Sequence, residues 1–417
     1  MKAIRTLCAV GVVAGLLATT GCSSGSGSDA GGVVKLSLWT GFTGPDRPAY
    51  EALVRQFNDA HSNIRVSMDV QPWDSITQKL PGAWASGQGP DLATPNSDPG
   101  SIFSYIKTNS VLPIDGAVGE GDGKLNVDAF PSSVTKAFTV DGKLYAAPAN
   151  MASVALYYNK AMFAAAGITA PPGTQEEFIA DARKLTNRNS NTNQYGISLA
   201  DHQTIQMWPL LQWMNGGDIV GADGCAKIAE PASVDALTTW ADLVANEHVS
   251  PVGQSGSEAD SLFSAKKAAM ELNGPWAADG FRKAGIDLGI APVPMGPGGP
   301  VTVVSSVPLM IGKSTQHKAQ AVEFLGWWTS KTAQTSFSAN SGFPPARTDV
   351  KVADPNVDVF ASALPNARLY LAGLEQSTQI DSDVYTQLVG KITRGFPVQP
   401  AAADAATAIN RVTGCAK

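Results

Sequence analysis

The sequence predicts an α/β fold, in which strands alternate with helices and the sheets are largely parallel. Two segments, Val33–Trp39 and Ile64–Val70, alternate apolar and polar residues as half-buried strands do. Between them, apolar residues from Tyr50 to Phe57 recur at the spacing of one helix face. This β-α-β opening favours parallel strands that are covered by helices, because the helix lets the next strand run in the same direction.

The rest of the chain continues the same alternation. Thr174 and Glu177 form a capping box, so a helix is expected from 176 to 186. Four prolines and three glycines between 292 and 300 predict a linker. Further strands are expected at 143–147, 154–158 and 268–272, and further helices at 73–86, 159–166, 233–247, 318–329 and 401–412.

The composition indicates a large folded protein without a nucleic-acid-binding surface. Its 417 residues suggest two to three domains at roughly 150 residues each. Hydrophobic residues make up 44% and charged residues 16%, which can fill a sizeable core and excludes a disordered chain. The 30 basic and 36 acidic residues give a net charge of −6, so no basic excess exists to neutralise phosphates.

Motifs of catalysis, metal binding and nucleotide binding are weak. The four histidines are scattered, with no pair at the spacing of metal ligands. Gly312-Lys-Ser resembles the end of a phosphate-binding loop, but Val307 replaces the first glycine of that motif. A carboxylate pair for glycoside hydrolysis stays open as an alternative, since no feature singles one out among the 36 acidic residues. We therefore expect no metal, no cofactor and no enzymatic activity.

The first residues resemble an export signal. Lys2 and Arg5 precede an apolar stretch from 7 to 18, which is shorter than the roughly 20 residues of a membrane-spanning helix. We therefore expect a signal peptide over residues 1–21. A Ser/Gly-rich tether is expected over 22–32, because such a composition makes a flexible linker.

The residues around Cys22 resemble the bacterial lipobox. Ala18-Thr19-Thr20-Gly21-Cys22 places a small residue directly before the cysteine that would carry the lipid. Lipidation at Cys22 would anchor the exported protein to the outer face of the cell membrane, since two or more acyl chains hold a protein stably. An ordinary signal peptide with an incidental cysteine stays open as the alternative.

Two cysteines remain beyond the leader, Cys225 and Cys415. In an oxidising compartment an isolated pair favours a disulfide, which here would close a loop of about 190 residues. Two unpaired thiols that lie too far apart to bond remain the alternative.

Eight short segments occur in a characteristic order between residues 33 and 412. They are Leu36–Thr40, Gly89–Asp91, Asp141–Tyr145, Leu156–Lys160, Phe163–Gly167, Pro171–Thr174, Ala269–Trp276 and Gly342–Arg347. In this order they resemble the family 1 extracellular solute-binding proteins of ABC importers, the maltose-binding-protein-like group. The resemblance covers nearly all of the chain that follows the leader.

The resemblance implies a type II periplasmic-binding-protein-like fold, with two α/β lobes and three interlobe crossings. We expect the crossings near 148–150, 303–309 and 343–346. Lobe 1 would then comprise 33–148 plus 306–344, and lobe 2 would comprise 149–305 plus 345–417. Cys225 and Cys415 would share lobe 2, and the protein is expected to be a monomer.

The resemblance also implies a receptor that captures a sugar or oligosaccharide and delivers it to the ABC permease in the membrane. Flat aromatic faces suit the apolar C–H faces of sugar rings. Trp276 is the first candidate for stacking, because Asn273-Gly-Pro-Trp ends a strand in the pattern that stacks on sugar in this family. The other aromatic candidates are Trp39, Trp73, Trp208 and Phe343.

Polar candidates would bind the hydroxyl groups of the sugar. Asp98 matches the position of a sugar-binding carboxylate in the family, and a carboxylate or guanidinium group can bind hydroxyls through paired hydrogen bonds. Asp98 as a loop cap and Arg347 as a salt-bridge partner between the lobes remain alternatives. The full polar set is Thr40, Asn96, Asp98, Asn150, Ser305 and Arg347.

Two further functions stay open. A receptor of the same build could take a glycerophosphodiester, which would call for Arg and Lys near the cleft motifs, or a polyamine, which would call for several carboxylates. Few basic residues lie near those motifs, and Asp98 alone hardly supplies the carboxylates. A secreted glycoside hydrolase is the third class.

Overall fold

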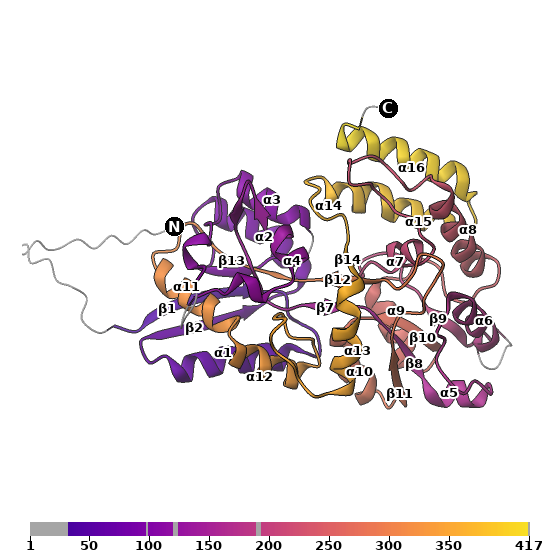
Figure 1. Cartoon of the computed structure of the whole chain (residues 1–417), viewed down its shortest axis with the longest axis horizontal. Coiled ribbons are helices and arrows are strands. Elements are labelled where there is room, and N and C mark those ends of the chain that lie inside the picture. The colour runs from indigo at the N-terminus through magenta and orange to yellow at the C-terminus, as the bar shows by residue number, and fades with distance from the viewer. Residues whose placement is uncertain (1–31, 97–98, 120–123, 189–192, 416–417) are drawn as a thin grey trace, which may run out of the picture.

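Two bodies lie side by side in the computed structural model and are joined by short strands (Figure 1). The structure describes residues 32–96, 99–119, 124–188 and 193–415. The expected signal peptide, Cys22 and Asp98 lie outside the described residues. Among the described residues, none of the helices has the length and apolar character needed to cross a membrane. Two large apolar clusters form the cores, one per body, and we call the bodies lobe 1 and lobe 2.

Lobe 1 is built on a five-stranded sheet of order β2-β1-β3-β13-β6. Strands β1 to β3 are parallel, as the sequence predicts, whereas β13 runs antiparallel to β3 and β6. The strands are β1 (Val34–Thr40), β2 (Ile64–Val70), β3 (Leu92–Thr94), β6 (Ala147–Pro148) and β13 (Pro308–Ile311).

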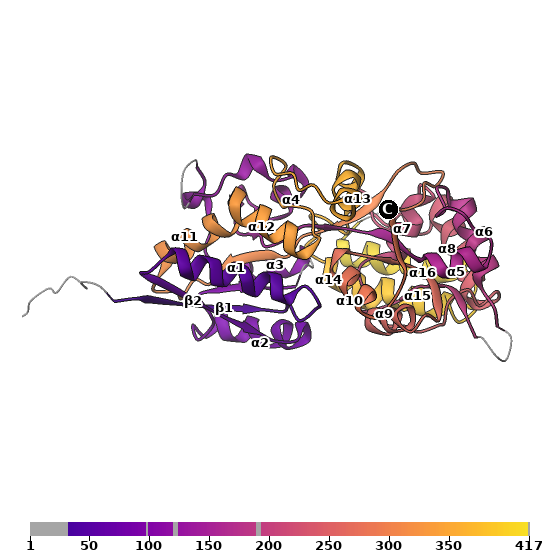
Figure 2. The same cartoon turned by 90° about the horizontal axis from the view of Figure 1, so that it is seen from below.

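Helices cover both faces of the lobe 1 sheet (Figure 2). Helix α1 (Arg47–Ala60) packs on the sheet through the apolar face that the sequence predicts, which carries Tyr50, Leu53 and Phe57. Helices α11 (Lys318–Trp328) and α12 (Lys331–Ser341) lie beside α1, and α2 (Trp73–Ala85) lies on the opposite face. The periphery holds α3 (Pro99–Lys107), α4 (Ser132–Ala137), β4 (Thr139–Val140) and β5 (Lys143–Leu144).

The sheet of lobe 2 has the order β11-β8-β10-β9 and is mostly antiparallel. This corrects the expectation of largely parallel sheets. Strand β8 enters directly from the other lobe, so it runs against both of its neighbours, and β9 with β10 is the parallel pair. The strands are β8 (Ala155–Asn159), β9 (Tyr195–Ser198), β10 (Ala268–Asn273) and β11 (Leu288–Ala291).

Helices surround the lobe 2 sheet (Figure 1). The predicted capping box is confirmed, because the Thr174 side chain accepts from the Glu177 backbone N–H and the Glu177 side chain accepts from that of Thr174. The helices are α5 (Lys160–Ala165), α6 (Gln175–Leu185), α7 (Met207–Met214), α8 (Pro231–Ala245), α9 (Gly256–Ser264), α10 (Ala278–Lys283), α15 (Thr386–Ile392) and α16 (Val398–Thr413).

A three-stranded sheet lies between the lobes (Figure 1). It consists of β7 (Ala152–Ser153), β12 (Thr302–Ser305) and β14 (Ala367–Leu369), in the order β14-β12-β7. The third crossing was expected at 343–346, but Phe343 and Ala346 are buried in the core of lobe 1. Helix α13 (Pro355–Ala363) then packs beside β7 and against β11 of lobe 2, and β14 follows it into the three-stranded sheet.

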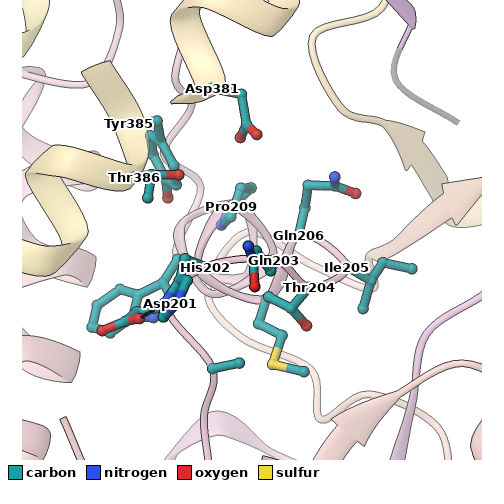
Figure 3. A pocket seen from close by; sticks show the side chains of 13 residues that line it. Asp201, His202, Gln203, Thr204, Ile205, Gln206, Pro209, Asp381, Tyr385 and Thr386 are labelled. Carbon is teal, nitrogen blue, oxygen red and sulfur yellow. Dashed lines mark hydrogen bonds and ion pairs between the residues drawn. The ribbon is translucent and has the colours of Figure 1, made fainter. Parts of the chain in front are cut away.

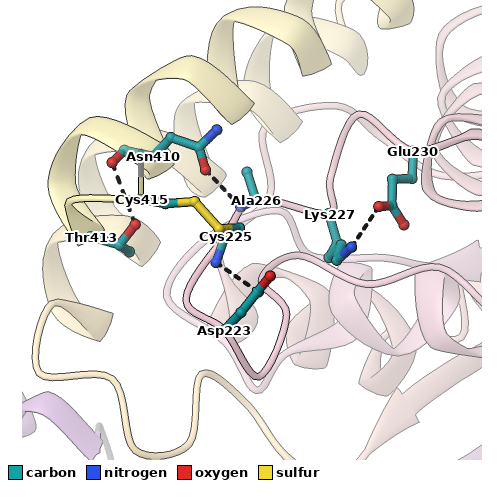
Figure 4. Close-up of a disulfide and its surroundings, with 8 residues drawn as sticks. All are labelled: Asp223, Cys225, Ala226, Lys227, Glu230, Asn410, Thr413 and Cys415. Atoms are coloured by element: carbon teal, nitrogen blue, oxygen red, sulfur yellow. Dashed lines mark hydrogen bonds and ion pairs between the residues drawn. A yellow bond between two sulfur atoms is a disulfide. The ribbon is translucent and has the colours of Figure 1, made fainter. Parts of the chain in front are cut away.

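A disulfide ties the end of α16 to a turn of the same lobe (Figure 4). It joins Cys225 to Cys415, whose Cα atoms lie 5.3 Å apart and which are 190 residues apart in the sequence. Beside it, Asn410 Oδ1 accepts a hydrogen bond of 2.8 Å from the Ala226 backbone N–H. The bridge therefore fixes the C-terminal helix against the body of lobe 2.

Candidate functional site

The carboxyl ends of strands from both lobes meet between the two sheets. Strand β1 ends at Thr40 and β10 ends at Asn273, and the carboxyl ends of strands are where open α/β sheets bind ligands. Trp276 follows β10 in a single 3₁₀ turn and packs both on the lobe 1 core and on a smaller lobe 2 cluster. The loop after β1 in lobe 1 also lies close to α10 of lobe 2, since a Cβ placed at Gly280 of α10 would lie 3.3 Å from Pro45 of that loop.

The backbone at Gly274 brings the Trp276 indole into this junction. A Cβ at Gly274 would lie 2.1 Å from the indole, so the ring can fold back only over a glycine. On the lobe 1 side, the centroid of the indole is 6.2 Å from that of Phe343. Trp276 is half-buried, which leaves part of the indole accessible at the junction.

Two further aromatic candidates lie on the lobe 1 side. Trp73 opens α2 and its indole lies against Gly41, where a Cβ would come within 2.1 Å of it. The ring of Phe42 meets that indole edge-on at a centroid distance of 5.6 Å. Trp39 and Trp73 are both half-buried, so each retains an exposed part.

Thr40 is buried at the end of β1. Its Oγ1 accepts hydrogen bonds from Thr94 Oγ1 at 2.7 Å and from the Phe42 backbone N–H at 3.3 Å. The side chain thereby joins the ends of β1 and β3, and its role as a ligand contact stays a prediction.

Asn150 is buried where the chain passes between the lobes, and the fold uses both ends of its amide, so its role as a ligand contact stays a prediction. Its Nδ2 donates to the hydroxyl of Tyr50 at 2.6 Å, and its Oδ1 accepts from the Val307 backbone N–H at 3.1 Å. Burial raises the pKa of Asp46, which shares a hydrogen bond with Tyr50, to about 6. The chain segments before β7 and after β12 are thus tied to α1.

Arg347 and Phe343 are both buried, and their roles as ligand contacts stay predictions. Arg347 is 6% exposed, and its guanidinium donates to both carboxylate oxygens of Asp349, at 2.8 and 2.9 Å. It also donates to the backbone carbonyl of Thr329 at 3.1 Å, so its donors are committed within lobe 1. Phe343 is buried among aromatic rings, including that of Phe337. Both side chains therefore contribute to the packing of lobe 1.

The two further polar candidates, Ser305 and Asn96, also stay predictions as ligand contacts. Ser305 is half-buried at the end of β12, where it pairs with Ala152 of β7. Asn96 is exposed two residues after β3.

Lobe 2 carries a pocket at the carboxyl end of β9 (Figure 3). It is lined by the loop after β9, the start of α7 and the segment that leads into α15. In Figure 3, Asp381 extends from the helix above toward the loop that carries Gln203 and Gln206. Trp208, a predicted site residue, lines the pocket, and its indole Nε1 has no hydrogen-bond partner among the described residues.

The lining of the pocket is part polar and part apolar, and none of the described residues that line it is Lys or Arg. His202 Nδ1 lies 2.6 Å from Asp201 Oδ1, while Asp201 Oδ2 accepts from the Gly253 backbone N–H at 3.0 Å. Amide and hydroxyl groups of Gln203 and Thr204 complete the loop side. Such a lining offers hydrogen bonds to a polar ligand without a lysine or arginine to neutralise an anion.

The pocket lies at the boundary between the lobes. Lys107 of α3 in lobe 1 forms an ion pair with Glu375, which lies six residues before Asp381. Helix α3 also contacts the short helix α14 (Ser377–Gln379) of lobe 2. One wall of the pocket therefore continues directly into a contact between the lobes.

The family profile of bacterial extracellular solute-binding proteins matches residues 43–335 of this chain. The chain belongs to this family. This solute-binding protein is 25% identical over 407 residues to the putative binding protein BAB2_0491 of Brucella abortus (strain 2308). The match covers 94% of this chain and 97% of the Brucella protein. Proteins of this family are exported and bind small solutes for delivery to an ABC permease, and neither the family nor the fold is one of enzymes.

Solved structures show the same fold. The GacH receptor of Streptomyces glaucescens, solved unliganded and with acarbose, is similar with a TM-score of 0.81 and 21% identity, over 92% of this chain and 100% of that one. UgpB of Mycobacterium tuberculosis, solved with glycerophosphocholine, gives a TM-score of 0.80 and 19% identity, over 92% and 99%. The solute-binding protein therefore has the two-lobe, type II fold that the resemblance implies.

Sequence reasoning missed most of the pocket of this solute-binding protein. The loop 201–206 carries a local signal that could have identified it, since a polar run directly follows a strand and precedes an apolar helix. Asp381 and Tyr385 carry no such signal, because they reach the pocket from a segment more than 170 residues further along the chain.

Proposed function

We propose that this solute-binding protein is a lipid-anchored receptor that captures a sugar or oligosaccharide between its two lobes. The observation that carries this proposal is the position of Trp276, a half-buried indole at the carboxyl end of β10 that packs on the lobe 1 core and on the smaller apolar cluster of lobe 2. A flat indole suits the apolar face of a sugar ring. The polar pocket around Gln203 supports the same ligand class, because hydroxyl groups need amide and hydroxyl partners.

The pocket favours a sugar over a phosphodiester. Phosphate groups call for Arg or Lys, and no residue of either type lines the pocket in the part of the chain that the structure describes. Of the two receptors named above, GacH was solved with acarbose and UgpB with glycerophosphocholine, so relatives of this fold take both classes of solute. The glycerophosphodiester therefore stays as the second candidate and belongs in every binding screen.

The proposed mechanism is a hinge that the ligand closes. A solute that contacts both lobes favours the closed form, since only that form makes both sets of contacts. The three strands β7, β12 and β14 are the segments at which the lobes would turn. A Kd on the order of 1 μM corresponds to about −8 kcal/mol, which a stacked ring and a few hydrogen bonds can supply.

A thermal-shift screen of the mature protein tests this proposal. The ligands are mono- to tetrasaccharides, with glycerophosphocholine, spermidine and buffer alone as comparisons. A sugar that binds raises the melting temperature through mass action and is not consumed over time. A shift with glycerophosphocholine or spermidine alone would overturn the sugar assignment, and accumulating hydrolysis products would indicate an enzyme.

Replacement of Trp276 tests the observation that carries the proposal. Trp276→Ala is expected to weaken the Kd for the sugar by at least about tenfold, the equivalent of about 1.4 kcal/mol, because the stacking face is lost. Trp327→Ala is the matched control: this half-buried indole packs on Phe57 within lobe 1. The control lowers stability without changing the Kd. Equal Kd values for both variants would remove Trp276 from the site.

The lipid anchor has its own test. Membrane and medium fractions of the producing cells are compared for the wild type and for Cys22→Ser. The proposal predicts that the wild type stays with the membrane and that the variant is released, because the acyl chains are attached through Cys22. Equal fractions for both proteins would contradict the anchor while leaving the binding proposal standing.

A further inference from the structure

Two carboxyl groups lie together directly behind the turn that carries Trp276. Glu271, in β10, is fully buried, and Asp260 reaches it from α9. Asn273 bridges them, since its Nδ2 donates to Asp260 Oδ1 at 2.7 Å and to Glu271 Oε1 at 2.9 Å. This cluster of Asp260, Glu271 and Asn273, which we call the carboxyl cluster, is distinct from the pocket around Gln203.

One more proton would let every carboxyl oxygen of Glu271 take part in a hydrogen bond. Oε2 of Glu271 receives no hydrogen bond from any described group, although Asn273 holds the Asp260 carboxyl beside that of Glu271. Two adjacent carboxylates repel each other strongly in apolar surroundings, so one of them takes up a proton. Burial and the neighbouring Asp260 raise the pKa of Glu271 well above its usual range. A protonated Glu271 completes the set by donating to Asp260.

The surroundings favour a proton over a metal ion. Tyr157 of β8 stands opposite Glu271, and its hydroxyl donates to a backbone carbonyl. On α10, Arg282 pairs with Asp279 at 3.5 Å, and both act electrostatically on Tyr157. Among the residues that the structure describes, no three His, Cys, Asp or Glu side chains gather as metal ligands. With two carboxyls and one amide, the cluster suits a single shared proton.

The carboxyl cluster connects to the Trp276 turn through Gly274. Asn273 Oδ1 accepts from the Gly274 backbone N–H at 2.8 Å, and the Tyr157 hydroxyl donates to the Gly274 carbonyl at 2.7 Å. Both polar groups of the glycine that supports the indole are therefore held by the cluster and its neighbour. Any movement of Asn273 would be transmitted to Trp276, because the indole lies on that glycine.

We propose that Glu271 is a positioning residue that holds a proton shared with Asp260 and thereby keeps the Trp276 indole in place for the ligand. This proposal depends on the proposed function only in assuming that a ligand binds at Trp276. When the proton leaves at high pH, the two carboxylates repel each other, Asn273 loses its position and the indole moves. Glu271→Gln mimics the protonated form, since its amide can donate to Asp260 at every pH.

The experiment measures the protonation of Glu271 and the position of Trp276 without any ligand. Infrared spectra of the full mature protein in heavy water are expected to show the C=O stretching band of a protonated carboxyl group at neutral pH. That band is absent in Glu271→Gln and retained in Glu176→Gln, a matched change at an exposed site on α6. Tryptophan emission of the wild type is expected to change with a midpoint well above the usual pKa of glutamate, about 4.3.

The comparison of variants decides the outcome. Glu271→Gln and Trp276→Phe are each expected to abolish that emission change, while Glu176→Gln retains it. A wild type without the infrared band, or a Glu271→Gln variant with the emission change of the wild type, would overturn the proposal. A metal ion that copurifies with the wild type and is lost in Glu271→Gln would overturn it as well. Because neither readout uses a solute, failure of the sugar screen leaves this test intact.

Discussion

Arg347 shows how the fold can use a residue whose chemistry would also suit a ligand. The same guanidinium geometry that binds hydroxyls in a cleft here holds Asp349 inside lobe 1. The sequence could not separate the two uses, because the Thr329 carbonyl that completes the site is 18 residues away. The partners of Thr40 and Asn150 could not be predicted for the same reason, since Thr94 and Tyr50 lie 54 and 100 residues away.

The Arg347–Asp349 pair predicts a loss of stability in acid. Hydrogen bonds from Arg347 lower the pKa of Asp349 from 3.8 to about 2. Because the folded state binds this proton more weakly than the unfolded state, the pair stabilises fully above about pH 4 and progressively less as the pH falls toward 2. Asp349→Asn is therefore expected to melt at a lower temperature than the wild type at pH 6, with a smaller difference at pH 2.5.

The control for this measurement is Asp235→Asn, the same change at an exposed position on α8. Its melting temperature is expected to follow that of the wild type across the pH range. A difference between Asp349→Asn and the wild type that stays constant from pH 6 to pH 2.5 would show that the carboxylate charge does not contribute.

At the scale of elements, local patterns predicted the helices and strands well, and long-range geometry was harder. The periodicity from Tyr50 to Phe57 gives α1, and the alternation at 33–39 gives β1, because each depends on neighbours in the sequence. The direction of β8 depends instead on the lobe from which the chain arrives. The segment 343–346, expected as a crossing, shows a similar limit, because no local pattern distinguishes a crossing from a buried loop.

The capping box of α6 gives a prediction at this scale. Thr174→Ala removes the side chain that accepts from the Glu177 backbone N–H, so the free energy of unfolding of the cooperative unit that holds α6 is expected to fall by about 1 kcal/mol. Urea unfolding followed by circular dichroism measures this change. Thr407→Ala, on the exposed face of α16, is the matched control and is expected to stabilise slightly, because alanine favours helices. An equally large fall in the free energy of unfolding of Thr407→Ala would contradict a specific capping role for Thr174.

At the scale of the molecule, the site is formed by segments that the sequence does not bring together. Trp276 could be predicted because its motif is local and ends a strand. The pocket near Trp208 combines the loop after β9 with Asp381 and Tyr385, and only the folded chain brings these together. Sequence patterns therefore single out individual candidates such as Trp276, which stays a prediction, but they do not bring distant segments together.

The disulfide gives a prediction for lobe 2 as a whole. Replacing both Cys225 and Cys415 by serine is expected to lower the free energy of unfolding by about 2–5 kcal/mol, because a long loop regains its freedom in the unfolded chain. Thermal unfolding with and without reductant measures the loss. The wild type with reductant should match the double variant, which itself should not respond to reductant. Equal melting temperatures for the oxidised wild type and the variant would show that the bridge does not stabilise the lobe.

Small-angle X-ray scattering measures whether the solute brings the lobes together. The mature protein is measured with and without the sugar that gives the largest thermal shift. We expect the radius of gyration to fall on addition of sugar, since a hinge that closes makes the molecule more compact. Trp276→Ala is expected to need more sugar for the same fall. A sugar that raises the melting temperature but leaves the radius of gyration unchanged would contradict capture between the lobes.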